Sequence, residues 1–155
     1  MGNITKWIKV SNCIDFMNVK NSISLTFDID WASDFVINHT IDLVEKFKKP
    51  ATWFITHNTP LLERLRQNKD FELGIHPNFD ELLNGNSKKN IESILDDLLK
   101  IVPEAKAIRS HSLTQSSRMI DIFKRKGLMF DCNSFIPHTS KIILKPFELW
   151  NGIIK

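Results

Sequence analysis

The chain has 155 residues, of which 42% are hydrophobic and 25% are charged, and its formal net charge is +3. This length fits one domain, residues 1–155, with a buried core, and the ordinary charge content argues against a disordered protein. Basic residues are scattered, so nothing predicts a nucleic-acid partner. Nothing approaches the roughly 18 apolar residues of a membrane span. The first ten residues do not resemble a secretory signal, and two distant cysteines favour a reduced, cytoplasmic protein.

Short apolar runs alternate with helical patterns from one end of the chain to the other. Alternation of Ile23, Leu25 and Phe27 predicts a strand, and further short apolar runs predict others. The predicted strands are 7–10, 22–27, 51–55, 71–75, 107–110 and 128–131. Apolar residues at helical spacing, with caps or Pro and Gly at the ends, predict helices at 34–48, 59–66, 90–102 and 116–126.

Strands that alternate with helices indicate an α/β fold with a parallel sheet. The number of strands is too small for a closed barrel, which needs about eight strand–helix units and roughly 200 residues or more. The chain ends on the apolar run Ile153-Ile154-Lys155. We therefore expect either an open sheet or the front part of a longer, C-terminally truncated barrel. An unpaired last strand would expose backbone and apolar surface and favour self-association.

Two carboxylates, Asp28 and Asp30, follow the first strong strand. Strand alternation would point both to one face, which is unfavourable unless they are paired or bind a cation. One could then bind a metal while the other handles a proton. The alternative is a pair of solvated acids that cap the next helix.

Two histidines and an arginine follow later strands. His76 comes directly after 71–75, and Arg109 and His111 come after the next predicted strand. Asp30, His76 and His111 together form a donor set that is common for zinc-like metals with an open site. Arg109 could hold a carboxylate through a bidentate pair. Surface histidines and a surface salt bridge are the alternatives. Asp80 could share a helical face with His76, although Pro77 favours an irregular turn there.

The remaining candidates carry weaker signals. Trp31 and Trp150 could stack on a sugar ring, although core packing is the commoner role of Trp. Cys132 fits a small buried residue better than a nucleophile. The other histidines show weaker patterns: His39 falls in mid-helix and is predicted to be solvated, His57 follows a strand and could line a site but has no partner, and His138 stands alone.

Several segments, in order and spacing, resemble the polysaccharide deacetylases of the NodB-homology group, carbohydrate esterase family four. These segments are Thr26-Phe27-Asp28-Ile29-Asp30, Ala51-Thr52-Trp53-Phe54-Ile55, Glu72-Leu73-Gly74-Ile75-His76, Ile108-Arg109-Ser110-His111-Ser112-Leu113 and Phe130-Asp131-Cys132-Asn133-Ser134. The residues that follow His76 and Arg109 are more similar to a deacetylase-like branch associated with surface-polysaccharide gene clusters. The resemblance runs from about residue 22 to 152.

The resemblance implies a distorted, incomplete (β/α) barrel that removes an acetyl group from an acetamido sugar with a divalent metal, most often zinc. Matched position by position, Asp28 is the general base, Asp30 and His76 are metal ligands, and Arg109 tethers the base. The acetylated sugar or polysaccharide precursor is the implied partner.

The departures from the family pattern are specific. Asp80 stands where the family has its second metal histidine, which makes His111 the best replacement for the third ligand. The Pro-Pro-Tyr that usually follows the arginine is missing, and nothing after residues 150–152 matches the motif that carries the family's general-acid histidine. We therefore consider two functions, a metal-dependent sugar N-deacetylase and a truncated, inactive relative that binds metal or sugar.

Overall fold

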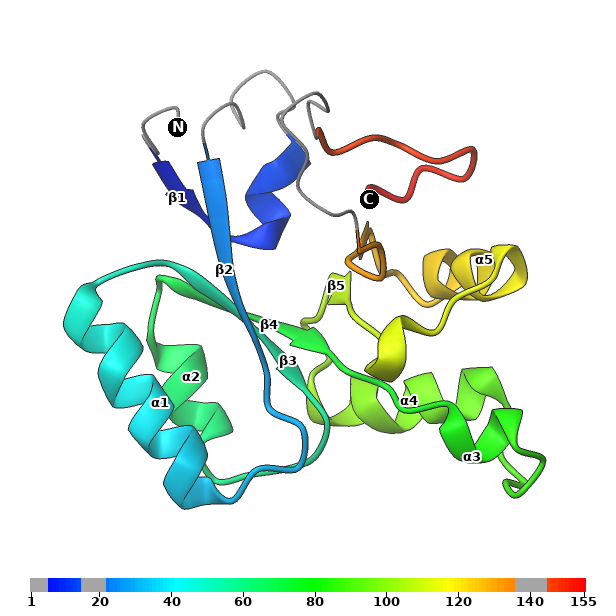
Figure 1. Cartoon of the computed structure of the whole chain (residues 1–155), viewed down its shortest axis with the longest axis horizontal. Coiled ribbons are helices and arrows are strands. Elements are labelled where there is room, and N and C mark those ends of the chain that lie inside the picture. The colour runs from blue at the N-terminus through cyan, green and yellow to red at the C-terminus, as the bar shows by residue number, and fades with distance from the viewer. Residues whose placement is uncertain (1–5, 15–21, 136–144) are drawn as a thin grey trace.

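The computed structural model describes residues 6–14, 22–135 and 145–155, and it contains a six-stranded parallel sheet. Its strands are ordered along the sheet as they occur in the chain, and the sheet curls into half of a barrel (Figure 1). They are β1(Lys6–Ile8), β2(Ser22–Asp28), β3(Ala51–Ile55), β4(Phe71–Ile75), β5(Ala107–Ile108) and β6(Phe130–Asp131). The prediction of an α/β fold with an incomplete parallel barrel is confirmed.

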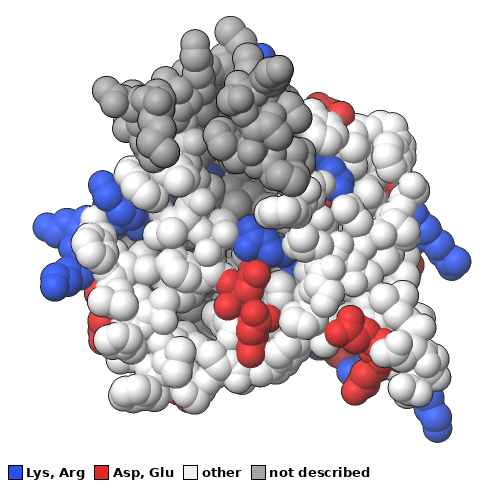
Figure 2. Space-filling model, viewed as in Figure 1, with Lys and Arg blue, Asp and Glu red and all other residues white. Residues whose placement is uncertain are grey.

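Helices and short 3₁₀ turns fill the connections between the strands. They are η1(Val10–Ile14), α1(Asp34–Phe47), α2(Leu62–Gln67), α3(Asp80–Leu83), α4(Ile91–Ile101), η2(His111–Leu113) and α5(Ser117–Arg125). In the described part of the chain, no helix has the length and apolar character needed to cross a membrane. On the face in Figure 2, acidic and basic side chains form small separate groups, without a broad patch of one sign.

The predicted helix ends match the observed ones where a cap specifies them. Asn90 and Ser93 form a reciprocal capping box at the start of α4, and the Ser116 hydroxyl accepts the Met119 amide at the start of α5. The helix predicted at 59–66 begins later, at Leu62, although the Thr59 hydroxyl oxygen accepts the Leu61 amide at 3.3 Å while its proton goes to the Asp34 carboxylate at 2.5 Å. The strand predicted at 107–110 is shorter, and α3 was not predicted.

The two faces of the sheet pack against different groups of residues, as β3 illustrates. Trp53 and Ile55 point outward into the large core beneath the helices, where Phe27 stacks on Trp53 at 4.5 Å between ring centroids. Thr52 and Phe54 alternate with them and face the concave side. There Phe54 packs in a second buried cluster with Val10, Ala107, Phe130 and Ile154. The concave side therefore has a packed floor beneath the carboxyl ends of the strands.

The apolar C-terminal run does not leave β6 with an open edge. Ile153 and Ile154 are buried, and Ile154 pairs with Phe130 in parallel and with Glu148 in antiparallel orientation. The Asp131 amide donates to the Ile154 carbonyl at 2.8 Å. Residues 153–155 thus extend the sheet past β6, and the unpaired edge predicted there is wrong. Self-association of the chain stays a prediction, but the unpaired edge of β6 no longer supports it.

Candidate metal and catalytic site

A tight turn at the carboxyl end of β2 sets the positions of the two aspartates. Asp28 is the last residue of β2, whereas Asp30 and Trp31 both have positive φ angles, 37° and 58°. The Ala32 amide closes the turn on the Ile29 carbonyl at 2.7 Å. Strand alternation, the basis of the prediction, therefore ends at Asp28. The left-handed turn, unfavourable for non-glycine residues, brings Asp30 back toward the same site.

His76 connects the two carboxylates. It follows β4, its amide donates to the Ile55 carbonyl at 2.8 Å, and its side chain is only 4% exposed. Its Nε2 lies 3.1 Å from Oδ1 of Asp30, and its Nδ1 lies 3.7 Å from Oδ1 of Asp28. Burial lowers the pKa of His76, although the charges of Asp28 and Asp30 oppose that shift. The imidazole is therefore neutral at physiological pH, which is its metal-binding form.

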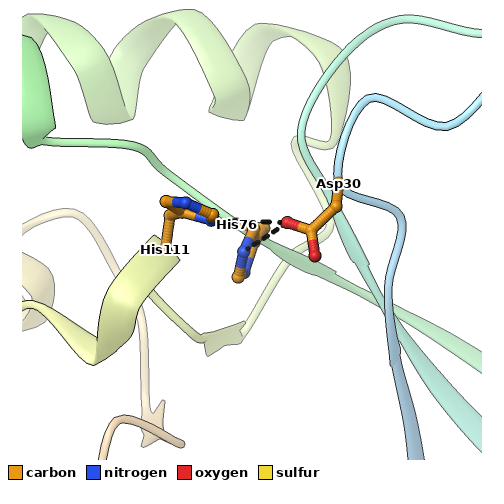
Figure 3. Close-up of side chains that lie close together, drawn as sticks. All are labelled: Asp30, His76 and His111. Carbon is orange, nitrogen blue, oxygen red and sulfur yellow. Dashed lines mark ion pairs between the residues drawn. The ribbon is translucent and has the colours of Figure 1, made fainter.

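His111 completes a cluster of three potential ligands. Its amide donates to the Pro77 carbonyl at 2.8 Å, and its Nδ1 lies 3.4 Å from Oδ1 of Asp30. One donor atom each from Asp30, His76 and His111 lies within 4.8 Å of the others. Figure 3 shows the three side chains pointing toward one another from separate elements. They follow β2, β4 and β5, so β3 lies between the strands that precede Asp30 and His76.

Arg109 holds Asp28 from the concave side. Its Nη1 donates to Oδ1 of Asp28 at 3.1 Å and to the Thr26 hydroxyl at 3.0 Å. Its guanidinium carbon lies 4.5 Å from the centroid of the buried Phe54 ring. Thr26 was missed in the sequence, although it lies two residues before Asp28 and therefore on the same face of β2. Asp28 is thus fixed by one cation and lies against the buried imidazole of His76.

Comparison with known proteins identifies the family to which this fold belongs. A family model described as WbmS-like polysaccharide deacetylase matches residues 25–155. The chain belongs to this polysaccharide deacetylase family. A solved structure from Bordetella bronchiseptica, assigned to the polysaccharide deacetylases and to O-antigen biosynthesis, is 43% identical with a TM-score of 0.89. The match covers 96% of this chain and 62% of that one, so the chain spans less than two thirds of its relative. A search of curated proteins finds no match.

The two tryptophans of this deacetylase-family chain lie in different places. Trp31 is half exposed, and its ring meets that of His111 edge-on at 5.3 Å. Trp150 lies in the turn that precedes residues 153–155, where Asn151 donates to Asp121 of α5. Because Ile154 runs parallel to Phe130, this turn lies toward the amino ends of the strands, away from the aspartates. The structure brings only Trp31 to the candidate site.

The other candidates are also separated from the cluster. Asp80 begins α3, where its amide bonds to the Asn78 side chain, and it is not part of the ligand trio. His39 is exposed on α1, and His138 lies outside the described residues. Burial raises the pKa of the Cys132 thiol to about 12, in keeping with the predicted unreactive cysteine.

His57, which the sequence left without a partner, lines a cleft that begins at the site. The cleft has a volume of about 770 Å³ and is lined at one end by Trp31 and His76. From there it runs between the segment after β3 and helices α3 and α4. The sequence gives His57 no partner, because its place in the cleft beside Trp31 and His76 depends on how the loop after β3 is folded.

The donor atoms of the site suit a divalent metal. One carboxylate and two imidazoles are the ligand types that zinc takes in open catalytic sites. The neutral, buried His76 needs no deprotonation to bind. Its other nitrogen, Nδ1, has no hydrogen-bond partner among the described residues and faces Asp28. A carboxylate beyond a ligating histidine commonly orients the ring, and Asp28 has that position.

Proposed function

We propose that this protein is a metal-dependent hydrolase that removes an N-acetyl group from a sugar of a surface polysaccharide or its precursor. The observation that carries the proposal is the contact of an Arg109-bound Asp28 with the Asp30–His76–His111 trio in a polysaccharide deacetylase fold. The role of the Bordetella relative in O-antigen biosynthesis supports the choice of a surface polysaccharide. A cytoplasmic location remains part of the proposal.

In this mechanism Asp30, His76 and His111 would hold the metal, and the donor types favour zinc. When bound, such a metal polarises an acetyl carbonyl and lowers the pKa of a coordinated water. Asp28 accepts the proton of the attacking water. Arg109 and Thr26 hold the Asp28 side chain in place, and Phe54 supports the guanidinium from below. The half-exposed Trp31 offers an aromatic surface for the sugar ring.

A binding protein without turnover is the second candidate. Asp80 occupies the position of the family's second metal histidine and stands outside the trio, so the ligand set departs from the family pattern. Such a protein would retain metal or sugar binding and release no acetate.

The test compares acetate release with bound metal in matched carboxylate variants. Asp28→Asn should keep zinc and lower turnover by about a hundredfold to ten-thousandfold, because it removes the general base. Asp30→Asn should lose zinc and turnover together. Asp80→Asn is the control, and it should keep both. Full activity of Asp28→Asn, or its loss of zinc as severe as that of Asp30→Asn, would refute the assigned roles. A zinc-loaded wild type that releases no acetate would favour the binding protein.

A further inference from the structure

His57 and its neighbours form a hydrogen-bonded chain that links the cleft to the aspartate turn. The Trp31 amide donates to the Thr56 hydroxyl oxygen at 3.2 Å, and that oxygen lies 2.8 Å from Nδ1 of His57. Trp31 in turn contacts His111. Thr56 therefore fastens the strained turn of Asp30 to the segment after β3 and holds the imidazole of His57 at the same time.

This arrangement fits the tautomer of the His57 ring in which the Thr56 hydroxyl donates to Nδ1. The Thr56 oxygen accepts from Trp31, and within the described residues its own proton has no acceptor besides Nδ1 of His57. A neutral imidazole that accepts at Nδ1 carries its proton on Nε2. Residue 57 lines the cleft and is only half buried. In this tautomer the Nε2–H is a donor for a ligand in the cleft.

The cleft itself suits an uncharged, hydroxyl-rich molecule. Its volume of about 770 Å³ falls in the range of small-molecule sites, about 300–1,000 Å³. Among the described residues that line it, Lys89 is the one Lys or Arg, and its Nζ is 2.9 Å from the Asp97 carboxylate. Glu81 adds a second negative charge. A phosphate or carboxylate would meet unfavourable charge here, whereas sugar hydroxyls could pair with the polar lining.

We infer that the cleft binds the uncharged sugar portion beyond the acetamido group and that His57 is its specificity-determining hydrogen-bond donor through Nε2. The identity of the ligand as a sugar rests on the proposed function. The position of His57 beside Trp31 and His76 puts this donor next to the proposed metal site and outside its ligand set.

The test uses the zinc-loaded 155-residue chain and N,N′,N″-triacetylchitotriose as the probe. Nitrogen-15 spectra should show the His57 ring with its proton on Nε2, and Thr56→Val should abolish this preference. Titration calorimetry should show His57→Ala binding the probe about tenfold more weakly, the loss of roughly one neutral hydrogen bond. His57→Gln, which keeps a donor, should recover part of the affinity. The exposed His39 serves as control, and His39→Ala should bind like the wild type.

The readouts separate this inference from the proposed function. Unchanged affinity in His57→Ala, loss of zinc in that variant, or no binding of the probe by the wild type would overturn the role of His57. Absence of acetate release with His57-dependent binding would overturn the hydrolase and leave the cleft assignment standing. Acetate release with a KM that His57→Ala does not alter would support the hydrolase and overturn the role of His57 in the cleft.

Discussion

Gly74 is the position where a single methyl group should test both the packing of the half-barrel and its link to the site. It is the fourth of the five residues of β4 and pairs with Phe54 on the concave face. A Cβ placed there would lie 2.8 Å from the Ala107 carbonyl oxygen and 2.8 Å from two carbons of the Phe54 ring. Neither neighbour can retreat easily. β4 and β5 are paired through Ile75 and Ile108, and Phe54 is fully buried beneath Arg109.

Gly74→Ala should therefore destabilise the fold by about 1–3 kcal/mol, the usual range for overpacking. For a chain of this length, about 2–4 °C is expected per kcal/mol, which gives a fall in Tm of roughly 2–12 °C. Urea unfolding at constant zinc measures the free energy. Because Phe54 supports the Arg109 guanidinium, displacement of its ring should also lower kcat for acetate release while zinc binding is kept.

Gly85→Ala is the matched control, since it adds the same methyl group in open space at a φ of 72°. Its penalty should be about 1 kcal/mol from the left-handed backbone alone, without an effect on kcat. Phe54→Leu should make room for the new methyl, so the double variant should be more stable than the sum of the two single changes predicts, by at least about 0.5 kcal/mol. Wild-type stability of Gly74→Ala, or strict additivity with Phe54→Leu, would refute this account of the contact.

Three further outcomes follow from the site and its turns. Zinc at about a hundred times its Kd should stabilise the folded chain by about 2.7 kcal/mol, and a chelator should reverse the shift in Tm; a Tm indifferent to zinc would argue against the site. Ser112→Gly should raise stability by roughly 0.5–1 kcal/mol in urea unfolding, because Ser112 has a φ of 56°; a destabilised variant would contradict this. Cys132, with a pKa of about 12, should resist thiol reagents at pH 7–8 until urea unfolds the chain, and rapid labelling of the native protein would show that its thiol is accessible and reactive.

Local patterns were sufficient for most of the secondary structure. The buried run at β3, the apolar stripe of α4 and the Asn90 capping box depend on residues a few positions apart, so the sequence alone specifies them. Strands that alternate with helices permit little besides a parallel sheet. Polar residues at the ends of those strands must then gather at one edge, which is why the sequence alone singles out Asp28, Asp30 and His76.

The tertiary structure decided how these residues meet. Asp30 reaches His76 through a left-handed turn of two non-glycine residues, and no short-range pattern predicts such a turn because it is intrinsically unfavourable. Thr26 gains its contact with Arg109 across 83 positions of sequence, through the pairing of distant strands. The same pairing places Trp150 at the far end of the sheet and buries the run that seemed to leave an open edge. Residue types and their order determine which groups are available, whereas strand pairing and loop backbone angles determine which of them come within bonding distance.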